Sequence, residues 1–365
     1  LENMKYQNLL QKKDLHILLT SGTVTSAKIL DKRLPKDILH QYVPIDNPGS
    51  VNRFLDRWHP DMVIWVESEL WPNLITKTAA RSIPMLLVNA RMSERAYKRW
   101  INFPSLISNL LNSFQLILAQ SDTDIKRLES LGAKEVKLCK NLKYDAPPLP
   151  INKIELGLLI NYIDDRPRWL AASTHREDEK IVIDAHCLVA KEIPNLLTII
   201  APRHPNRTLE IQETLRKRGL TIATRSCEEQ IMPDTDIYIA DTLGEMGTLY
   251  CLSNIAFIGG SFGDHGGHNP IEPALLENSI IAGLDMSNFE SGCKSLDDAS
   301  AITRVTDALT LGDTLKRLLT NNVLSKQKAD AAMDAAKLLG GGTTNALYEI
   351  ERILDGLPQE TNVRT

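Results

Sequence analysis

The chain has no run of about 20 apolar residues, the length that a helix needs to cross a bilayer, so its sequence predicts no membrane-spanning segment. Its five cysteines are odd in number and none lies in a CxxC pair, which disfavours both a zinc site and a framework of disulfide bonds. We expect reduced thiols, as in proteins of the cytosol. Internal repeats and low-complexity tracts are absent too.

The common nucleotide-binding signatures are also missing. The chain has neither a Walker motif nor a GxGxxG motif with the acidic residue that grips a ribose, so dinucleotide oxidoreduction is disfavoured. No Asp-X-Asp motif follows an expected strand in the second half, and we therefore expect no metal ion and no other cofactor. The net charge of −4 lacks the basic excess of nucleic-acid-binding proteins, which argues against a nucleic-acid partner.

With 365 residues, 43% of them hydrophobic and 24% charged, the chain exceeds one ordinary core, so we expect a soluble protein of two domains. Short apolar runs alternate with amphipathic segments, as in the βαβ units of a parallel sheet. The first half holds four such runs, which we expect to be strands buried on both faces, at residues 15–21, 61–68, 83–90 and 114–121. The second half holds five, at residues 166–173, 195–205, 236–242, 254–261 and 279–283.

A cluster of prolines, Pro147, Pro148 and Pro150, separates the two halves as a domain linker would. The sequence thus predicts an α/β fold of two Rossmann-like, doubly wound lobes that face each other across a cleft. Their expected bounds are residues 1–147 and 148–338, followed by a C-terminal helix and tail at 339–365. Ligands of such sheets bind beyond the carboxyl ends of the strands, so the segments that follow the strands are candidate sites.

The segment 259–274, between an expected strand and an expected helix, is rich in glycine. Asn269 is a favourable N-cap, Pro270 suits the first helical position and Glu272 falls at the third, so a capping box accounts for these residues without a ligand. The five glycines before them cost conformational entropy unless the backbone must approach something closely. A glycine loop that leads into a helix N-terminus presents free amides to an anion, and we interpret it as a phosphate-binding loop.

Three other expected strand ends in the same lobe carry polar residues. Residues 202–204 follow one strand, and Arg203 there can bind a phosphate through two hydrogen bonds. Another strand leads to Asp241 and then to residues 244–246 at a helix start, a pattern that alone indicates a helix cap. Residues 173–175 follow the lobe's first strand. Each signal is weak by itself, but their convergence favours a nucleotide site.

In the first lobe, Glu67 and Glu69 follow an expected strand and precede Trp71. Two carboxylates beside an indole can serve as acid and base. Alternatively, one of them caps the helix that Pro72 opens and the other faces solvent. Lys143, just before the linker, places a cation close to the boundary between the lobes.

The segment 90–114 combines basic, aromatic and apolar residues. The basic residues Arg91, Arg95, Lys98 and Arg99 are combined with the aromatic residues Tyr97, Trp100 and Phe103 beside an apolar helix. A basic and aromatic face of this kind fits docking on an anionic membrane surface, and a solvated helix face explains it equally well.

Seven of these segments together resemble the 3-deoxy-D-manno-octulosonic acid (Kdo) transferases of lipopolysaccharide synthesis, which are glycosyltransferases with the GT-B fold. The resemblance runs in order and at fitting separations from about residue 15 to residue 354. It is carried by ESELWPNLI, VNARMSER, KNLKYD, STHREDE, PRHPNR, ADTLGEMGTLY and GGHNPIEPA.

The resemblance implies a cytidine monophosphate (CMP)-Kdo donor, a lipid A precursor such as lipid IVA as acceptor, and peripheral contact with the cytoplasmic face of the inner membrane. It implies that Glu67 and Lys143 stabilise the transition state, and we place Arg91, Arg95 and Lys98 near the acceptor's phosphates and the membrane. The residues that it matches to the CMP site are Pro202, Arg203, Gly244, Glu245, Met246, Asn269, Pro270, Ile271 and Glu272.

The chain departs from the family in two places. The family's catalytic base is a Glu in an SVGE-type motif, which we expect upstream of Leu1, because Glu2 has the wrong neighbours. Lys140 stands where the family has Gly before Asn-Leu-Lys. We therefore expect a truncated transferase, also without the family's membrane-proximal N-terminal segment, that binds CMP but transfers Kdo poorly.

Two other functions stay open at this point. A GT-B enzyme that uses a UDP-sugar, as a transferase or an epimerase, would keep both lobes and would bind UDP in preference to CMP. A non-catalytic module that binds lipid A would have no use for a nucleotide site.

Overall fold

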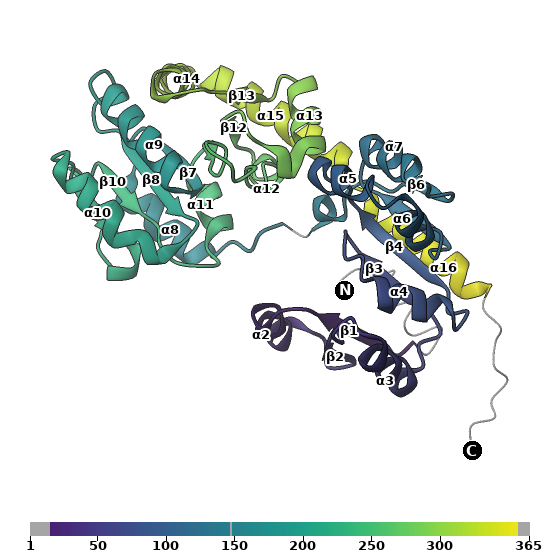
Figure 1. Cartoon of the computed structure of the whole chain (residues 1–365). Helices are drawn as coiled ribbons and strands as arrows, with labels where there is room; N and C mark the ends of the chain where they lie inside the picture. The colour runs from purple at the N-terminus through teal and green to yellow at the C-terminus, as the bar shows by residue number, and fades with distance from the viewer. Residues whose placement is uncertain (1–14, 147, 357–365) are drawn as a thin grey trace. The chain divides into compact units, whose positions relative to one another are not determined.

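The computed structural model describes residues 15–146 and 148–356. Its α/β fold is built as two compact units (Figure 1). The first unit takes the chain up to Asp145 and again from Gly341 onward, and the second takes Ala146–Gly340. Glu2 and Pro147, both named in the sequence predictions, lie outside the described residues.

The first unit contains a parallel sheet of four strands, in the order β3 (Val63–Val66), β4 (Met85–Ala90), β5 (Leu116–Ala119) and β6 (Val136–Leu138). A separate parallel pair is formed by β1 (Ile17–Ser21) and β2 (Ile38–Tyr42). As expected, β4 and β5 are buried along their whole length. The expected burial of both faces is wrong for β1, which belongs to the two-stranded sheet, and for β3, which is an edge strand.

Helices cover both faces of the four-stranded sheet, since successive residues of a strand point to opposite faces. On one face, Leu87 belongs to a core that includes Ile107. On the other, Leu86 packs in a core with Ala346 and Ile353 of the chain's last described helix (Figure 1). The helices of this unit in the described residues are α2 (Val24–Arg33), α3 (Pro48–Trp58), α4 (Pro72–Ala79), α5 (Glu94–Trp100), α6 (Pro104–Leu111), α7 (Asp122–Ser130), the 3₁₀ helix η1 (Leu142–Asp145) and α16 (Gly342–Asp355).

The second unit is built on one parallel sheet of seven strands. Its order is β13 (Ile302–Arg304), β12 (Ser279–Ala282), β11 (Ile255–Ile258), β7 (Arg168–Thr174), β8 (Leu197–Pro202), β10 (Ile237–Ile239) and β9 (Ile222–Thr224). β7, β8, β10, β11 and β12 confirm the five strands that the sequence predicts in this half. The sequence did not predict β9 and β13, which have three residues each.

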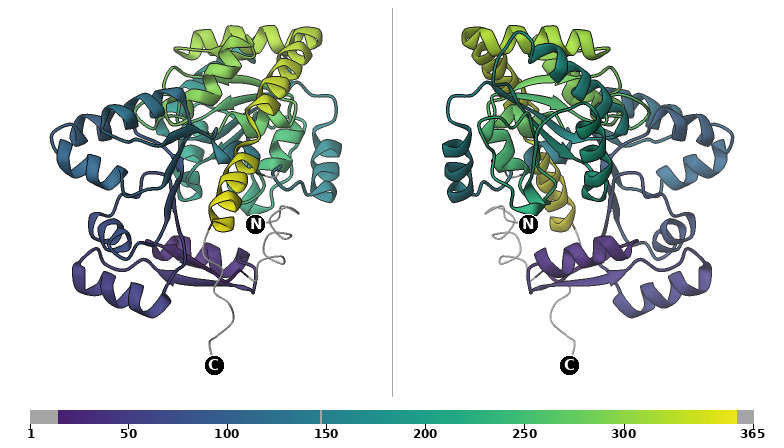
Figure 2. Two further views of the ribbon diagram at one scale, coloured as in Figure 1. Left: turned by 90° about the vertical axis from the view of Figure 1, so that its right-hand side faces the viewer. Right: turned by 90° about the vertical axis from the view of Figure 1, so that its left-hand side faces the viewer.

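Helices flank both faces of this sheet as well (Figure 2). Trp169, Ile200 and Phe257 are fully buried in a core that helices α9 and α14 share. The helices are α8 (Lys153–Ile163), α9 (Arg176–Val189), α10 (Thr208–Lys217), α11 (Met246–Leu252), α12 (Ile271–Leu275), α13 (Glu290–Asp298), α14 (Ala308–Thr320) and α15 (Asn322–Leu339).

The strand order places a potential ligand site within the second unit. From β7 the chain passes to β8, then to β9 at the edge of the sheet and back to β10 between them. It then crosses to the other side of β7 and builds outward through β11, β12 and β13. The order therefore reverses between β7 and β11. Ligands of doubly wound sheets bind beyond the carboxyl ends of the strands at such a reversal.

Candidate functional site

Four histidines gather where β7, β8 and β11 end, and we call them the histidine cluster: His175, His204, His265 and His268. The Nε2 atoms of His175 and His268 lie 3.0 Å apart. The His265 ring stacks on His175 with 3.9 Å between ring centroids, and the His204 ring meets His175 edge-on at 5.6 Å. Three strand ends of the second unit thus supply one group of imidazoles.

The two inner rings of the cluster are held in their neutral form. Burial lowers the pKa of His175 and of His268 from 6.5 to about 4. The neighbouring histidines and the charge of Arg203 lower both values further. Each ring of the pair therefore carries one proton at neutral pH and has one nitrogen that can accept a hydrogen bond.

Arg203 is a cation whose charge lowers the pKa of both rings. It is exposed, and its backbone amide donates to the carbonyl of Thr174, which fixes the end of β8 to the end of β7. Within the part of the chain that the structure describes, its guanidinium has no hydrogen-bond or ion-pair partner. The predicted CMP-binding residues Pro202 and Arg203 therefore end a buried strand with a cationic group that is available to an anion.

The amides of the glycine loop are not open to a phosphate in the way that the sequence suggested. The buried carboxylate of Asp178 accepts hydrogen bonds from the backbone amides of His175, Gly260 and Phe262. The amide of Gly266 donates to Asp285. An aspartate of the chain thus occupies the amide-lined position, and it ties the loop to the start of α9.

The protein's own packing explains why glycines stand in this loop. A Cβ at Gly259 would lie 2.3 Å from the carbonyl oxygen of Ser173, so β11 can approach β7 here only without a side chain. A Cβ at Gly267 would lie 2.2 Å from the sulfur of Met286. The close approach that the glycines predicted is real, and the neighbour is another part of the same unit.

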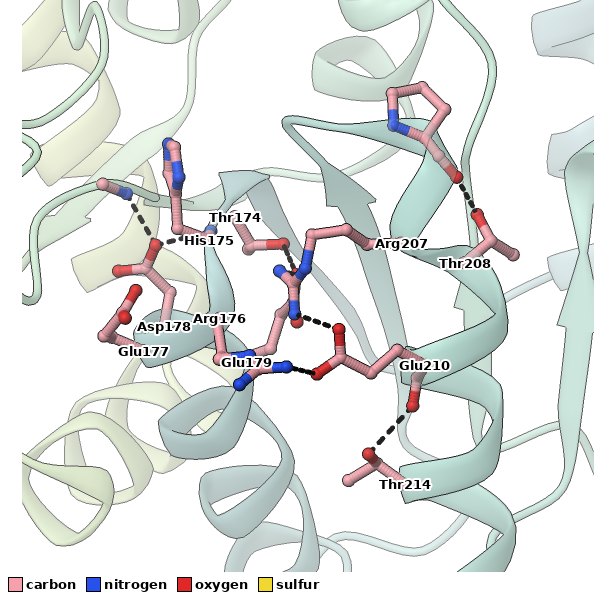
Figure 3. A network of polar contacts seen from close by, with 12 residues as sticks. Thr174, His175, Arg176, Glu177, Asp178, Glu179, Arg207, Thr208, Glu210 and Thr214 are labelled. Atoms are coloured by element: carbon pink, nitrogen blue, oxygen red, sulfur yellow. Dashed lines mark hydrogen bonds and ion pairs between the residues drawn. The ribbon is translucent and has the colours of Figure 1, made fainter.

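A chain of ion pairs holds the loop after β8 against α9 (Figure 3). Arg207 contacts Glu179 at 2.8 Å and Glu210 at 3.3 Å, and Arg176 also pairs with Glu210. Burial raises the pKa of Glu179 to about 7, although the adjacent Arg207 opposes that rise. The network lies next to a cavity of about 300 Å³ between α9 and α10, and it positions the segment that carries Arg203.

The carboxylate of Glu245, a predicted CMP-binding residue, is engaged within the protein. Gly244 has a φ of 90°, and Glu245 then precedes the first residue of α11, Met246. Its carboxylate is paired with Arg225 at 2.8 Å and accepts the hydroxyl of Thr242, and the hydrogen bond from Arg225 lowers the pKa of Glu245. A ligand at this strand end would meet the amides of the α11 start.

The capping box predicted at the start of α12 is not formed. The helix begins at Ile271, so Pro270 is the N-cap and Asn269 precedes it. The Asn269 side chain accepts from the amide of Ile271 at 3.0 Å and also bonds to the carboxylate of Glu272. Burial raises the pKa of that carboxyl. The helix starts one residue later than predicted for a local reason: Asn269 forms an Asx-type hydrogen bond to the residue two positions ahead, Ile271.

In the first unit, the structure brings Glu67 and Lys143 together. The Lys143 Nζ lies 2.7 Å from Glu67 Oε1, and the two side chains are 56% and 43% exposed. Glu67 follows β3 with a φ of 63°, in the left-handed region that non-glycine residues rarely adopt. Its amide donates to Val88 at 2.9 Å, which holds this conformation in place.

The other carboxylate of this segment, Glu69, accepts from the indole nitrogen of Trp71 at 2.7 Å. Neither Glu67 nor Glu69 caps α4. Asp46 does so, because its carboxylate accepts from the amides of Asn73 and Leu74. The alternative that one of the two glutamates is a helix cap is therefore wrong.

In the basic and aromatic segment 90–114, the basic side chains are exposed as predicted for Arg95 and Lys98, but two of the aromatic rings are not. Arg95 and Lys98 are exposed on α5, where Lys98 pairs with Glu94, and the carbonyl of Arg91 accepts from the hydroxyl of Ser68. Tyr97 and Trp100 pack against the core of the unit, so the expected aromatic face is wrong for these two rings. The exposed apolar residues beside the basic ones are Ile101, Phe103 and Leu106.

Among residues 15–146 and 148–356, no group of His, Cys, Asp or Glu side chains is arranged to hold a metal ion. None of the helices in these residues combines the length and the apolar character that crossing a bilayer requires.

Sequence reasoning missed three parts of the site: Asp178, the pairing of His268 with His175, and the ion pair of Glu179 with Arg207. The capping role of Asp178 at α9 could have been found, because an aspartate three residues after an N-cap position indicates a capping box, but its bonds to Gly260 and Phe262 could not. The other two join distant segments, and no local pattern indicates them.

The chain is similar in sequence to transferases of 3-deoxy-D-manno-octulosonic acid. The family described as "3-Deoxy-D-manno-octulosonic-acid transferase (kdotransferase)" matches residues 5–146. A 3-deoxy-D-manno-octulosonic acid transferase of Rickettsia felis is 36% identical over 316 residues, which are 87% of this chain and 68% of the relative. The enzyme of that name from Haemophilus influenzae is 32% identical over 349 residues, 93% of this chain and 79% of the relative.

Solved structures with low sequence identity share the fold. A glycosyltransferase from Rickettsia africae superposes with a TM-score of 0.64 at 17% identity and covers 98% of this chain and 93% of its own. A UDP-GlcNAc 2-epimerase from Neisseria meningitidis, bound to UDP-GlcNAc, gives a TM-score of 0.59 at 16% identity, with 93% and 94% covered. These structural similarities establish the GT-B fold, in which the chain forms two Rossmann-like units.

Proposed function

The chain belongs to the family of 3-deoxy-D-manno-octulosonic acid (Kdo) transferases, and on this premise we propose which residues bind its donor and which assist the transfer. Its activity is that of a glycosyltransferase that transfers Kdo in lipopolysaccharide biosynthesis. The donor is CMP-Kdo, and we propose that the second unit binds it at the reversal of strand order. The observation that carries this assignment is the guanidinium of Arg203 at the end of β8, which has no partner within the part of the chain that the structure describes.

The donor site would combine a cation with backbone groups from three strand ends. Arg203 would bind the phosphate of CMP, since a guanidinium forms two parallel hydrogen bonds to such a group. The amides at Gly244, Glu245 and Met246 and the groups of Asn269, Pro270, Ile271 and Glu272 would contact the rest of the nucleotide. Because Asp178 fills the amide hollow of the glycine loop, we assign the phosphate to Arg203 rather than to that loop.

The chemical step would depend on charge stabilisation. CMP leaves with its bonding electrons while the anomeric carbon of Kdo gains positive charge, and the leaving phosphate is stabilised by Arg203. The pair of Lys143 and Glu67 in the first unit has both signs of charge on exposed atoms, as stabilisation of a polar transition state requires. We propose these two residues as the transition-state stabilisers, with no metal ion required.

The acceptor would be a lipid A precursor such as lipid IVA. We propose that its phosphates meet Arg91, Arg95 and Lys98 of the first unit. The exposed side chains of Ile101 and Phe103 lie in the same segment as those cations. Apolar groups beside cations are typical of peripheral contact with an anionic lipid surface. We therefore place the protein at the cytoplasmic face of the inner membrane.

The donor assignment can be tested by the binding of nucleotides to the protein and to Arg203→Ala. We expect CMP to bind in preference to UDP, and we expect the variant to lose about 10- to 100-fold in CMP affinity, because a hydrogen-bonded charge is removed. Isothermal titration calorimetry measures both. Arg216→Ala is the matched control, since Arg216 is an exposed arginine of α10 in the same unit.

Three outcomes would overturn the assignment. Preferential binding of UDP would favour a UDP-sugar donor. Unchanged CMP affinity in Arg203→Ala would show that the phosphate binds elsewhere. Absence of any nucleotide binding by the wild-type protein would remove the proposed donor site altogether.

A further inference from the structure

The pair formed by His175 and His268 has a geometry that simple packing does not need. Their Nε2 atoms face each other at 3.0 Å, and the ring planes are inclined by 6°. The two rings come from different strand ends, β7 and the loop after β11. Each ring lies close enough to Arg203 for that charge to lower its pKa.

We propose that His175 and His268 act as one proton-accepting pair that, together with Arg203, binds an anionic oxygen group of the donor and gains one proton as the anion binds. That group is either the phosphate of the nucleotide or the carboxylate of the transferred acid sugar. The proposal rests on the proposed function, since it names the groups that meet the donor's negative charge.

The hydrogen bond between the two rings allows the neutral pair to accept one additional proton. In the neutral pair, one ring donates its Nε2–H to the bare Nε2 of the other, whose own proton is on Nδ1. The donating ring then has a bare Nδ1. One added proton enters there, the bond between the rings persists, and the pair carries a charge of +1 with both Nδ1–H groups as donors. A second proton would set two N–H groups against each other at 3.0 Å.

The surroundings explain why the pair needs an anion to keep that proton. Without one, burial and the positive field of Arg203 disfavour the charged form. The acidic groups nearby are already engaged: Glu177 lies 3.3 Å from His265 Nε2, and Asp178 accepts three backbone amides. The charged and titratable groups that face the pair are, from α9, Glu177 and Asp178; from the end of β8, Arg203 and His204; and from the loop after β11, His265.

An anion beside Arg203 reverses this balance. It compensates the charge of Arg203 and attracts a proton to the pair, since a nearby opposite charge favours the charged form of a titratable group. Binding and protonation then reinforce each other by linkage: whatever anion binds more tightly to the protonated pair must raise its proton affinity. Histidines that only fill space would stay neutral in both states.

Proton uptake can be measured directly by calorimetric titration in buffers of different ionisation enthalpy. The probe is the methyl ester of CMP, a phosphodiester with no ionisation of its own near neutral pH. We expect the wild-type protein to take up about one proton per bound ester near pH 6 and to gain up to about tenfold in affinity per unit fall in pH from about 7.5 to 5.5. Free Kdo, the second probe, carries the carboxylate without the phosphate.

The variant His268→Gln removes one titrating ring and keeps a hydrogen-bonding side chain. We expect it to bind the ester more weakly and without proton uptake, and we expect its affinity to be flat over the same pH range. His59→Asn is the control, because His59 is an exposed histidine of the first unit in the left-handed conformation that Asn tolerates. It should match the wild-type protein in both measurements.

The outcomes separate this proposal from the donor assignment. Proton uptake on binding of the ester would show that the phosphate binds at the pair. Proton uptake with free Kdo but not with the ester would show that the carboxylate binds there. If the wild-type protein binds the ester but takes up no proton with the ester or with free Kdo, the pair does not have the proposed role. This conclusion does not depend on whether His268→Gln folds. If the ester does not bind at all, the proposed function itself fails.

Discussion

At the scale of single residues, Glu67 combines two features that no local sequence pattern indicates. This residue has the left-handed backbone and an ion pair with Lys143, and both features lie directly after β3. A left-handed conformation costs a non-glycine residue about 1–2 kcal/mol, so it persists only where the surroundings hold it. Val88 does so through the amide of Glu67. The strained backbone presents the carboxylate to Lys143.

The role of that pair can be tested with Lys143→Ala. We expect kcat for Kdo transfer to fall by about 100- to 1,000-fold, as when one charge-stabilising donor is removed, with CMP affinity unchanged. The melting temperature should change little, since exposed ion pairs contribute about 0–1 kcal/mol. Transfer assays and thermal unfolding measure both. Lys326→Ala breaks an exposed ion pair with Asp330 and is the control; equal kcat values in the two variants would contradict the assignment.

Sequence reasoning at this scale succeeded where the signal is local and failed where it is not. Arg203 at the end of β8 was predicted from the strand and the arginine that follows it, and the structure leaves its guanidinium without a partner in the described residues. The role of the glycine loop was predicted wrongly in part, because the residue that fills it, Asp178, lies far away in the sequence. Short glycine patterns indicate a close approach and do not identify the neighbour.

At the scale of elements, the loop between β11 and α12 carries His268 and depends on its contact with β7. Gly259→Ala would set a methyl group 2.3 Å from the Ser173 carbonyl, which is backbone and cannot move alone. We expect a loss of about 1–3 kcal/mol in the free energy of unfolding, as for other overpacked sites. CMP affinity should fall with it, because the loop that carries His268 is displaced.

Gly157→Ala is the matched control for this change. Gly157 lies within α8, and a Cβ there would meet no atom within 4 Å. We expect a gain of about 0.5–1 kcal/mol, since alanine is the better helix former. Thermal or denaturant unfolding compares the two variants. If Gly259→Ala were as stable as the wild-type protein, β11 and β7 would not be in the contact described.

The sequence predicted long buried strands correctly, but it missed two short strands and misplaced one helix start. Long apolar strands such as β4 and β8 were predicted because burial on both faces leaves continuous apolar runs. β9 and β13 were missed because these three-residue strands are only partly buried, whereas β10 has the same length but is apolar and buried throughout. The start of α12 was misplaced by one residue, since Asn269 can cap a helix or bond two positions ahead with equal chemistry.

At the scale of the whole molecule, the chain leaves the first unit at Asp145 and returns to it at Gly341. The return is fixed by Asp145, whose carboxylate accepts from the amides of Gly341 and Thr343, and by the ion pair of Lys137 with Glu349. α16 then covers one face of the β3–β6 sheet. The sequence indicates a last helix but not the sheet that it covers, because an amphipathic pattern does not identify its partner.

Three histidines, the buried His186 and the partly buried His175 and His268, make the stability of the ligand-free protein depend on pH. The pKa values of His175, His186 and His268 are each lowered from 6.5 to about 4, chiefly by burial. His186 shows the cause plainly: Thr198 bonds its Nδ1, and its buried Nε2 has no partner among the described residues. Between about pH 6.5 and 4, the unfolded chain binds protons that the folded chain does not, so the free energy of unfolding falls as pH falls.

We therefore expect the melting temperature to fall on acidification through that window. Glu179 acts in the opposite direction, because its pKa is raised from 4.5 to about 7 and its contribution grows as pH falls between those values. Burial also raises the pKa values of Asp178 and Glu272, which act in the same direction as Glu179. The lowered pKa values of Glu177, Glu245 and Glu349 act with the histidines, so we expect the net change to be a loss. His268→Gln should make the decline shallower and Glu179→Gln should make it steeper, and thermal unfolding at a series of pH values compares them. A melting temperature that rose on acidification would mean that these histidines are protonated in the folded state, which the partnerless Nε2 of His186 could not accommodate.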